Sequence, residues 1–158
     1  MTAIDMTPID RFADEYEFLS NFARIPVTRN GITYPTNEHA FQAAKATNPA
    51  DAARILAAPT PGDAKRIGRR IQLRHDWEQI KLDIMLECLR AKFSPPPIRT
   101  MLLATGQRPL VEGNNWHDRY FGVCFSCQYG CDHVGENHLG RLLMQVREEL
   151  REELLGWG

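Results

Sequence analysis

Apolar side chains recur every three or four residues in two stretches of the chain, which is the period of an α-helix with one face in a core. The positions are Ile80, Ile84, Leu86 and Leu89 in one stretch and Leu139, Leu143, Val146 and Leu150 in the other. They predict the longest helix over about 77–93, with Trp77 at its entry, and a core-packed helix over 137–154.

Capping side chains predict where other helices begin. Thr36 precedes a predicted helix over 37–46, and Asp76 with Gln79 resembles a capping box at the start of the helix from residue 77. Three further pairs join a capping side chain to a proline, which has no N–H to lose at the first helical position. These pairs are Asn48-Pro49, Thr60-Pro61 and Ser94-Pro95.

A small β component accompanies the helices. Residues 24–28 and 32–34 flank Asn30-Gly31, a dipeptide that tolerates the positive φ of tight hairpin turns, so they predict an antiparallel hairpin. Residues 109–112 predict a further short strand, which is followed by a segment rich in loops.

The composition suits one ordinary globular domain. The chain has 158 residues, of which 43% are hydrophobic and 25% charged. We predict an α+β fold, mainly helical with a small antiparallel β component, in which residues 1–14 are loosely ordered and 15–158 form a single domain. The formal net charge of −1 excludes a strong global field toward nucleic acid or anionic lipid.

Four cysteines raise the question of compartment and metal. No apolar stretch is long enough to span a bilayer and no secretory signal is visible, so we predict a cytoplasmic protein with no membrane partner. Cysteines there are thiols or metal ligands rather than disulfides. Cys124, Cys127, Cys131 and His133 form a C-x2-C-x3-C-x-H string, which predicts either a structural zinc site or uncoordinated thiols.

Three polar side chains of the predicted helix over 37–46 share one narrow face. Glu38, Gln42 and Lys45 lie at positions i, i+4 and i+7, and each residue turns about 100° around the helix. Such a face would present a carboxylate, an amide and an amine to one ligand. The same spacing is common on solvated helix faces, so a plain surface is the alternative. His39 lies off this face and is predicted to be structural.

Motifs spread over nearly the whole chain resemble those of one family. They are EFLSNF (17–22), PTNEHAFQAAK (35–45), IGR (67–69), DWE (76–78), LRAKF (89–93), LLAT (102–105), WHDRYFG (116–122) and GENHLGRLLM (135–144). Together and in this order they resemble the NADAR (NAD- and ADP-ribose-associated) family, which includes N-glycosidases of riboflavin intermediates.

The resemblance implies an enzyme that cleaves ribose from an exocyclic amine, with no cofactor required for catalysis. Two substrate classes are implied: ribosylamino-pyrimidine phosphates of early riboflavin synthesis, and guanine in nucleic acid that bears ADP-ribose on its amine. The resemblance places Glu38, Trp77 and Asp118 where the family has essential residues. It places Lys45 where a Schiff-base lysine has been proposed.

Two mechanisms stay open on this basis. In the first, the Lys45 amine displaces the base from a ring-opened ribosylamine and forms a Schiff base, while Glu38 moves protons. In the second, Glu38 and Asp118 act as the paired carboxylates of glycosidases, one steadying an oxocarbenium-like ribose and the other activating water. We favour the first.

Residues in or beside the matching motifs complete the predicted substrate site. The predicted contacts are Asn21, Gln42, Arg69, Trp77, Trp116 and Asn137. Three site residues have structural alternatives: Trp77 as a core residue, Asp118 as a turn cap and Asn137 as a helix cap. Arg69 belongs to a basic cluster that would meet phosphates or form a solvated helix end. The cluster also contains Lys65, Arg66 and Arg70.

The chain departs from the family pattern after Tyr120. Phe121-Gly122-Val123 stands where many members have Trp-Gly-Asp, so an acidic group is missing beside the predicted site, and the substrate and the role of Asp118 stay open. Two other functions are alternatives. One is a module that binds ADP-ribose without cleaving it, and the other is a zinc-braced nucleic-acid-binding domain, which the near-neutral charge disfavours.

Overall fold

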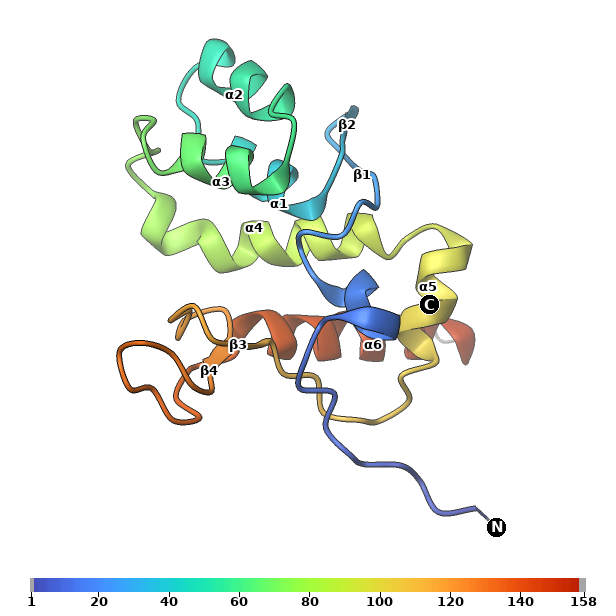
Figure 1. Ribbon diagram of the computed structural model, residues 1–158. Coiled ribbons are helices and arrows are strands. Elements are labelled where there is room, and N and C mark those ends of the chain that lie inside the picture. Colours follow the sequence, from blue (N-terminus) through green and yellow to red (C-terminus); the bar gives the residue numbers. More distant parts are fainter. Residues whose placement is uncertain (1, 157–158) are drawn as a thin grey trace. The chain divides into compact units, whose positions relative to one another are not determined.

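The computed structural model, drawn in Figure 1, describes residues 2–156. The chain divides into two compact units. The central unit is Asn21–Ser94, and the terminal unit combines the chain up to Ser20 with the chain from Pro95 onward. Helices dominate both units, so the predicted α+β class is confirmed. No helix within the described residues has the length and apolar character needed to cross a membrane.

Helix α1 is the innermost element of the central unit. It contacts the other three helices and both strands of the unit, and Figure 1 shows α2, α3 and α4 around it. Every residue of α1 is buried, which a helix on a solvated face would not be. The elements are β1 (Val27–Arg29), β2 (Ile32–Tyr34), α1 (Asn37–Ala43), α2 (Pro49–Leu56), α3 (Pro61–Gly68) and α4 (Trp77–Lys92).

The predicted hairpin is confirmed, with shorter strands. Val27 pairs with Tyr34 and Arg29 with Ile32, which leaves Asn30-Gly31 as the turn. Both turn residues have positive φ, 53° and 77°, the combination that a type I′ turn requires.

Three predicted caps are confirmed. The side chains of Thr36, Asn48 and Thr60 each accept a hydrogen bond from the backbone N–H three residues further on. Pro49 and Pro61 stand at the start of α2 and α3, as predicted.

Two other predicted caps are wrong. Asp76 precedes α4, but its carboxylate accepts two bonds from the Arg74 guanidinium, at 3.1 and 3.0 Å, and makes no cap. A charged donor is the stronger partner for a carboxylate, so it displaces the backbone N–H. Ser94 does not cap either, because α5 begins one residue later than predicted, with Pro95 in the capping position and Pro96 first in the helix.

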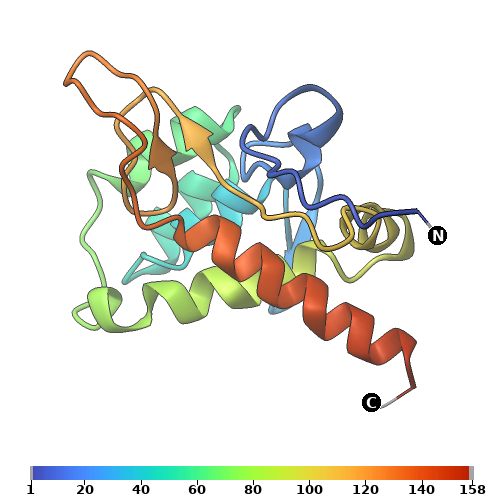
Figure 2. The same cartoon turned by 90° about the horizontal axis from the view of Figure 1, so that it is seen from below.

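Helix α6 is the longest element of the terminal unit. At 17 residues it exceeds α4 by one, so the prediction that α4 is the longest helix is wrong. The predicted core positions Leu139, Leu143 and Val146 are buried, and α5 packs against α6. Figure 2 shows α6 leading out of the loop that carries the short strands. The elements are the 3-10 helix η1 (Asp14–Leu19), α5 (Pro96–Leu103), β3 (Gly113–Asn114), β4 (Val123–Cys124) and α6 (His138–Leu154).

The predicted strand over 109–112 is reduced to a single bridge. Leu110 pairs with Ile9, and two backbone bonds of 2.8 and 2.9 Å flank the pair. Ile9 is 3% exposed, so the segment 1–14, expected to be loosely ordered, is fixed at this point. Strands β3 and β4 pair in parallel, which adds to the predicted antiparallel component.

Candidate active site

The start of α1 sets the position of Glu38. The backbone carbonyl of Asn21 accepts the Glu38 N–H at 3.0 Å, which satisfies one of the free donors of the first helical turn. The Asn21 side chain accepts a 2.8 Å bond from Nδ2 of Asn37. Asn21, predicted to bind substrate, therefore holds the end of the helix that carries Glu38.

His39 is fully buried and structural, in agreement with its prediction. Its Nε2 lies 2.9 Å from the Ala58 carbonyl oxygen, which can only accept, so this nitrogen carries a hydrogen. Its Nδ1 lies 2.7 Å from Oγ1 of Thr36. Both ring nitrogens are used in contacts within the protein, and His39 has no part in the proposed chemistry.

Glu38 and Gln42 form a buried polar pair. Nε2 of Gln42 donates to Oε1 of Glu38 at 2.8 Å, and the two residues are only 6% and 3% exposed. The alternative of a solvated helix face is therefore wrong for both. Oε1 of Gln42 is buried without a hydrogen-bond partner among residues 2–156. A buried carbonyl in that state is suited to accept a bond from a ligand.

Gly68, the last residue of α3, lies directly against the Gln42 side chain. A Cβ atom at Gly68 would collide with the amide of Gln42. This close approach confines the amide that contacts Glu38. In the sequence Gly68 stands out only as part of the IGR motif, because its role depends on how α3 packs against α1.

Lys45 lies just beyond α1 rather than on it. The helix predicted over 37–46 ends at Ala43, and the Lys45 N–H bonds to the Gln42 carbonyl in a tight turn. The Lys45 carbonyl accepts a hydrogen bond from the backbone N–H of Arg74, which fixes the turn. The Lys45 amine nevertheless reaches the aromatic side chains of the unit, because Nζ lies 5.8 Å from the ring centroid of Phe41 and 5.8 Å from that of Trp77.

The surroundings of Lys45 lower the pKa of its amine. Burial is the largest cause, because it penalises the charged form, and the Glu38 carboxylate opposes it. The positive charges of Lys65, Arg69 and Lys81 add to the lowering. The amine is therefore neutral more often than that of an ordinary lysine, which a nucleophile requires.

Trp77 is both a core residue and a neighbour of the Lys45 amine. It is 5% exposed, and its ring lies tilted against Phe41 with centroids 5.1 Å apart. The aromatic pair forms an apolar surface beside the amine. The core and site interpretations of Trp77 are thus compatible.

The basic cluster at the end of α3 has two parts. Arg66 pairs with Asp63 on the same helix, as a solvated helix end would, whereas Lys65 and Arg69 act on the Lys45 amine.

Lys65→Gln is expected to raise the pKa of Lys45, because one repelling charge is removed. The neutral fraction of the amine then falls at a given pH, and the rising limb of the kcat/KM profile moves to higher pH. Arg66→Gln is the matched control, and an equal shift in both variants would contradict the assignment.

Asp118, in the terminal unit, caps a turn. Its Oδ1 accepts bonds from the backbone N–H groups of Tyr120 and Phe121, at 3.1 and 3.0 Å. The buried Asn114 side chain bonds both the N–H and the carbonyl of Asp118. Asp118 therefore caps a turn, as its structural alternative predicted, and a catalytic role of Asp118 stays a prediction.

The terminal unit also carries Trp116 and Asn137. Trp116 is 62% exposed and lines a cavity of about 460 Å³ with Phe125. Asn137 stands before α6 without capping it, so that alternative is wrong. Its side chain instead accepts from the Glu112 N–H and donates to the Leu110 carbonyl, at 3.0 Å each.

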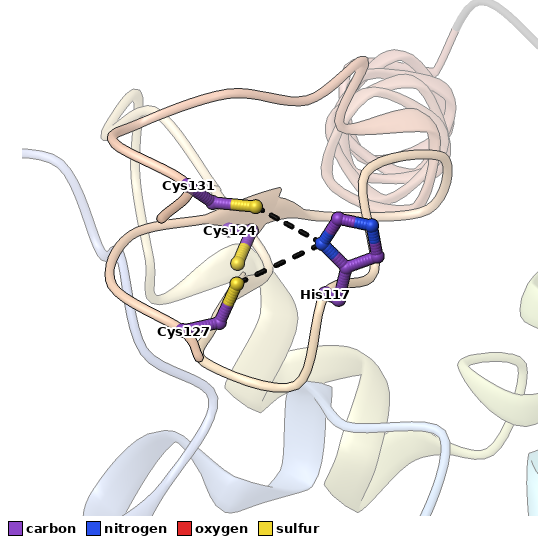
Figure 3. Close-up of side chains that lie close together, drawn as sticks. All are labelled: His117, Cys124, Cys127 and Cys131. Carbon is purple, nitrogen blue, oxygen red and sulfur yellow. Dashed lines mark hydrogen bonds between the residues drawn. The ribbon is translucent and has the colours of Figure 1, made fainter. Parts of the chain in front are cut away.

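Three cysteines and one histidine converge in the loop before α6 (Figure 3). The donor atoms of His117, Cys124, Cys127 and Cys131 all lie within 4.8 Å of one another, so the cluster could hold a metal ion. The structure places His117, rather than the predicted His133, beside the three cysteines. His133 is exposed, and its Nδ1 lies 3.2 Å from the Asp132 carboxylate.

The pKa values of two thiols in this cluster are shifted in opposite directions. Burial raises the pKa of Cys127, but hydrogen bonds from Cys131 and Cys124 outweigh it and lower the pKa below its ordinary value. The bond with Cys127 raises the pKa of Cys131. The cluster therefore favours a thiolate, the form that binds metals.

The family follows from comparison with known proteins. A model of the NADAR domain matches residues 9–151, which include parts of both units. This chain belongs to the NADAR family. N-glycosidase YbiA of Shigella flexneri serotype 5b is 40% identical over 144 residues, which are 89% of this NADAR chain and 86% of that protein.

Two further matches extend the comparison. The NMR structure of the E. coli protein YbiA has a TM-score of 0.81 at 38% identity, and the alignment covers 97% of this chain and 90% of that one. Riboflavin biosynthesis protein VVA0006 of Vibrio vulnificus is 37% identical over 88% of this chain and 37% of that protein. Since relatives matching most of its length are N-glycosidases, this NADAR protein is an enzyme, a hydrolase of the N-glycosidase type.

Proposed function

We propose that this enzyme hydrolyses the bond between C1 of a ribose and an exocyclic amine, with Lys45 as nucleophile and Glu38 as proton carrier. One observation carries the proposal: the Lys45 amine is half-buried beside Phe41 and Trp77, has a lowered pKa and lies within electrostatic range of the buried Glu38 carboxylate. A lysine prepared in this way suits attack on an imine carbon.

The substrate supplies that imine itself. A ribose attached to an amine opens its ring, and C1 becomes doubly bonded to the nitrogen. The Lys45 amine adds to C1, a proton passes to the nitrogen of the base through Glu38, and the C1–N bond to the base breaks. A Schiff base then joins Lys45 to C1 of the ribose, and water adds to this carbon, which releases the sugar and restores the Lys45 amine.

The remaining groups support binding. The unpaired Oε1 of Gln42 would accept a hydrogen from a ribose hydroxyl or from the leaving amine. The positive charges of Lys65, Arg69 and Lys81 near the Lys45 amine suit a substrate that carries phosphate. Trp77 offers an aromatic surface beside the amine.

Of the two substrate classes, we favour ribosylamino-pyrimidine phosphates. Relatives named as riboflavin biosynthesis proteins, from Vibrio vulnificus and Zea mays, contain a segment similar to this chain. An ADP-ribosylated guanine substrate is part of a nucleic-acid strand. The net charge of −1 gives the protein no broad electrostatic attraction to such a strand. No step of the proposed scheme runs through a metal, so a metal held by the terminal unit, with zinc the ion we favour, would be structural.

A side-by-side assay tests the substrate. Purified enzyme is given a ribosylamino-pyrimidine phosphate or an oligonucleotide with ADP-ribosylated guanine, and released base and sugar are measured by mass spectrometry. We expect faster hydrolysis of the pyrimidine compound. Cleavage of the oligonucleotide alone would overturn the substrate, and cleavage of neither would overturn the proposed function.

A further inference from the structure

The four donor atoms of the cluster in Figure 3 lie close enough together to hold one metal ion. Nδ1 of His117 lies 3.0 Å from Sγ of Cys131 and 3.7 Å from Sγ of Cys127, and all four donors fit within 4.8 Å. Zinc bonds of about 2.3 Å to sulfur and about 2.0–2.1 Å to nitrogen place tetrahedral ligand atoms about 3.5–3.8 Å apart. We propose that His117, Cys124, Cys127 and Cys131 bind a structural Zn²⁺ ion.

The donor set selects the metal. Three thiolates and one imidazole in a tetrahedral arrangement suit zinc, whereas magnesium and calcium require oxygen ligands. With four protein ligands the coordination sphere is closed, so no position is left for water or substrate. The ion would therefore brace the loop and take no part in chemistry.

The backbone holds the donors in place. Cys124 and Val134 exchange two backbone bonds, of 2.8 and 3.1 Å, which return the chain to its starting point. Between them, the Gly130 N–H bonds to the Cys127 carbonyl, and Gly130 has the left-handed φ of 77° that this turn needs. Such tight turns are what structural zinc sites use to gather nearby cysteines.

His117 is held in an uncommon conformation. Its φ is 71°, in the left-handed region that residues with a side chain rarely adopt, and its ring lies 4.6 Å from that of Tyr129. A conformation of this kind persists only when the surroundings fix it. A bond from Nδ1 to the metal would fix it. It would also hold the neighbouring residue Asp118 in its turn.

Metal content tests the site directly. Protein is purified under reducing conditions without metal-affinity chromatography. Inductively coupled plasma mass spectrometry is then expected to find one zinc ion per chain. Zinc-edge X-ray absorption should fit three sulfur neighbours and one nitrogen. His117→Ala and Cys127→Ser should lose zinc, whereas the matched control His133→Ala, in the same loop, should keep it.

Measurements on the unmutated chain keep the test independent of folding defects in the variants. Metal-free protein should take up one equivalent of Co²⁺ and show the absorption of a tetrahedral thiolate complex. Failure to bind one equivalent of Zn²⁺ or Co²⁺ would overturn the proposal. So would zinc that is retained in His117→Ala but lost in His133→Ala, or a stable disulfide among the three cysteines. None of these measurements depends on glycosidase activity, so the site can fail without affecting the proposed function.

Discussion

Glu38→Gln is expected to reduce turnover by about 10²–10⁴-fold, the scale of a lost general acid–base. The substituted amide keeps an oxygen that can accept the 2.8 Å bond from Gln42, so the buried pair should survive and the fold with it. It cannot take up and release a proton at neutral pH. Steady-state kinetics and calorimetric binding of a non-hydrolysed substrate analogue give the two readouts, and the affinity should change little.

Glu87→Gln is the matched control for this experiment. Glu87 belongs to the same unit, is exposed and pairs with Arg29, so its loss should leave both kinetics and binding near those of the unsubstituted enzyme. Turnover retained by Glu38→Gln would contradict its role as proton carrier. Equal loss of affinity and of turnover would mean that Glu38 only binds substrate.

Lys45→Arg is expected to reduce turnover by roughly 10³-fold or more, as losing a covalent nucleophile does. Arginine keeps the positive charge but stays protonated, so it cannot attack C1. Borohydride added during turnover should reduce the Schiff base of the unsubstituted enzyme and leave ribose on Lys45, found by peptide mass spectrometry. The variant should show no adduct.

Lys65→Arg serves as the control, because it keeps a positive charge near Lys45 and leaves the nucleophile in place. Its trapped adduct should match that of the unsubstituted enzyme. If hydrolysis proceeds without any trapped adduct, the covalent scheme is wrong. A mechanism in which water attacks C1 without a covalent lysine would then take its place.

Local signals in the sequence predicted local structure well. The caps at Thr36, Asn48 and Thr60 and the Asn30-Gly31 turn depend on a few adjacent residues, so packing did not change them. The Asp76 cap failed because a charged neighbour, Arg74, offered its carboxylate a better partner. Competition between side chains of this kind is not visible in a capping pattern.

The candidate site was predictable in its residue types but not in its geometry. Helical spacing brought Glu38 and Gln42 together, yet Lys45 reaches the site from a turn, where the chain leaves α1 and residue 46 pairs with Leu73. In the cluster of cysteines before α6, adjacency in sequence favoured His133, whereas the fold brings in His117 from before the cysteines. Long-range packing decides such cases, and one sequence does not show it.

The contact between Gly68 and Gln42 has a consequence for engineering this enzyme. Replacing a helical glycine by alanine is a routine way to gain up to about 0.5–1 kcal/mol of stability, and Gly68, the last residue of α3, would be considered for such a change. Here the added methyl group would displace the Gln42 amide and, through it, the Glu38 carboxylate. Stabilising substitutions should therefore be sought at other positions, because a larger residue at position 68 would disturb the side chains that the proposed reaction uses.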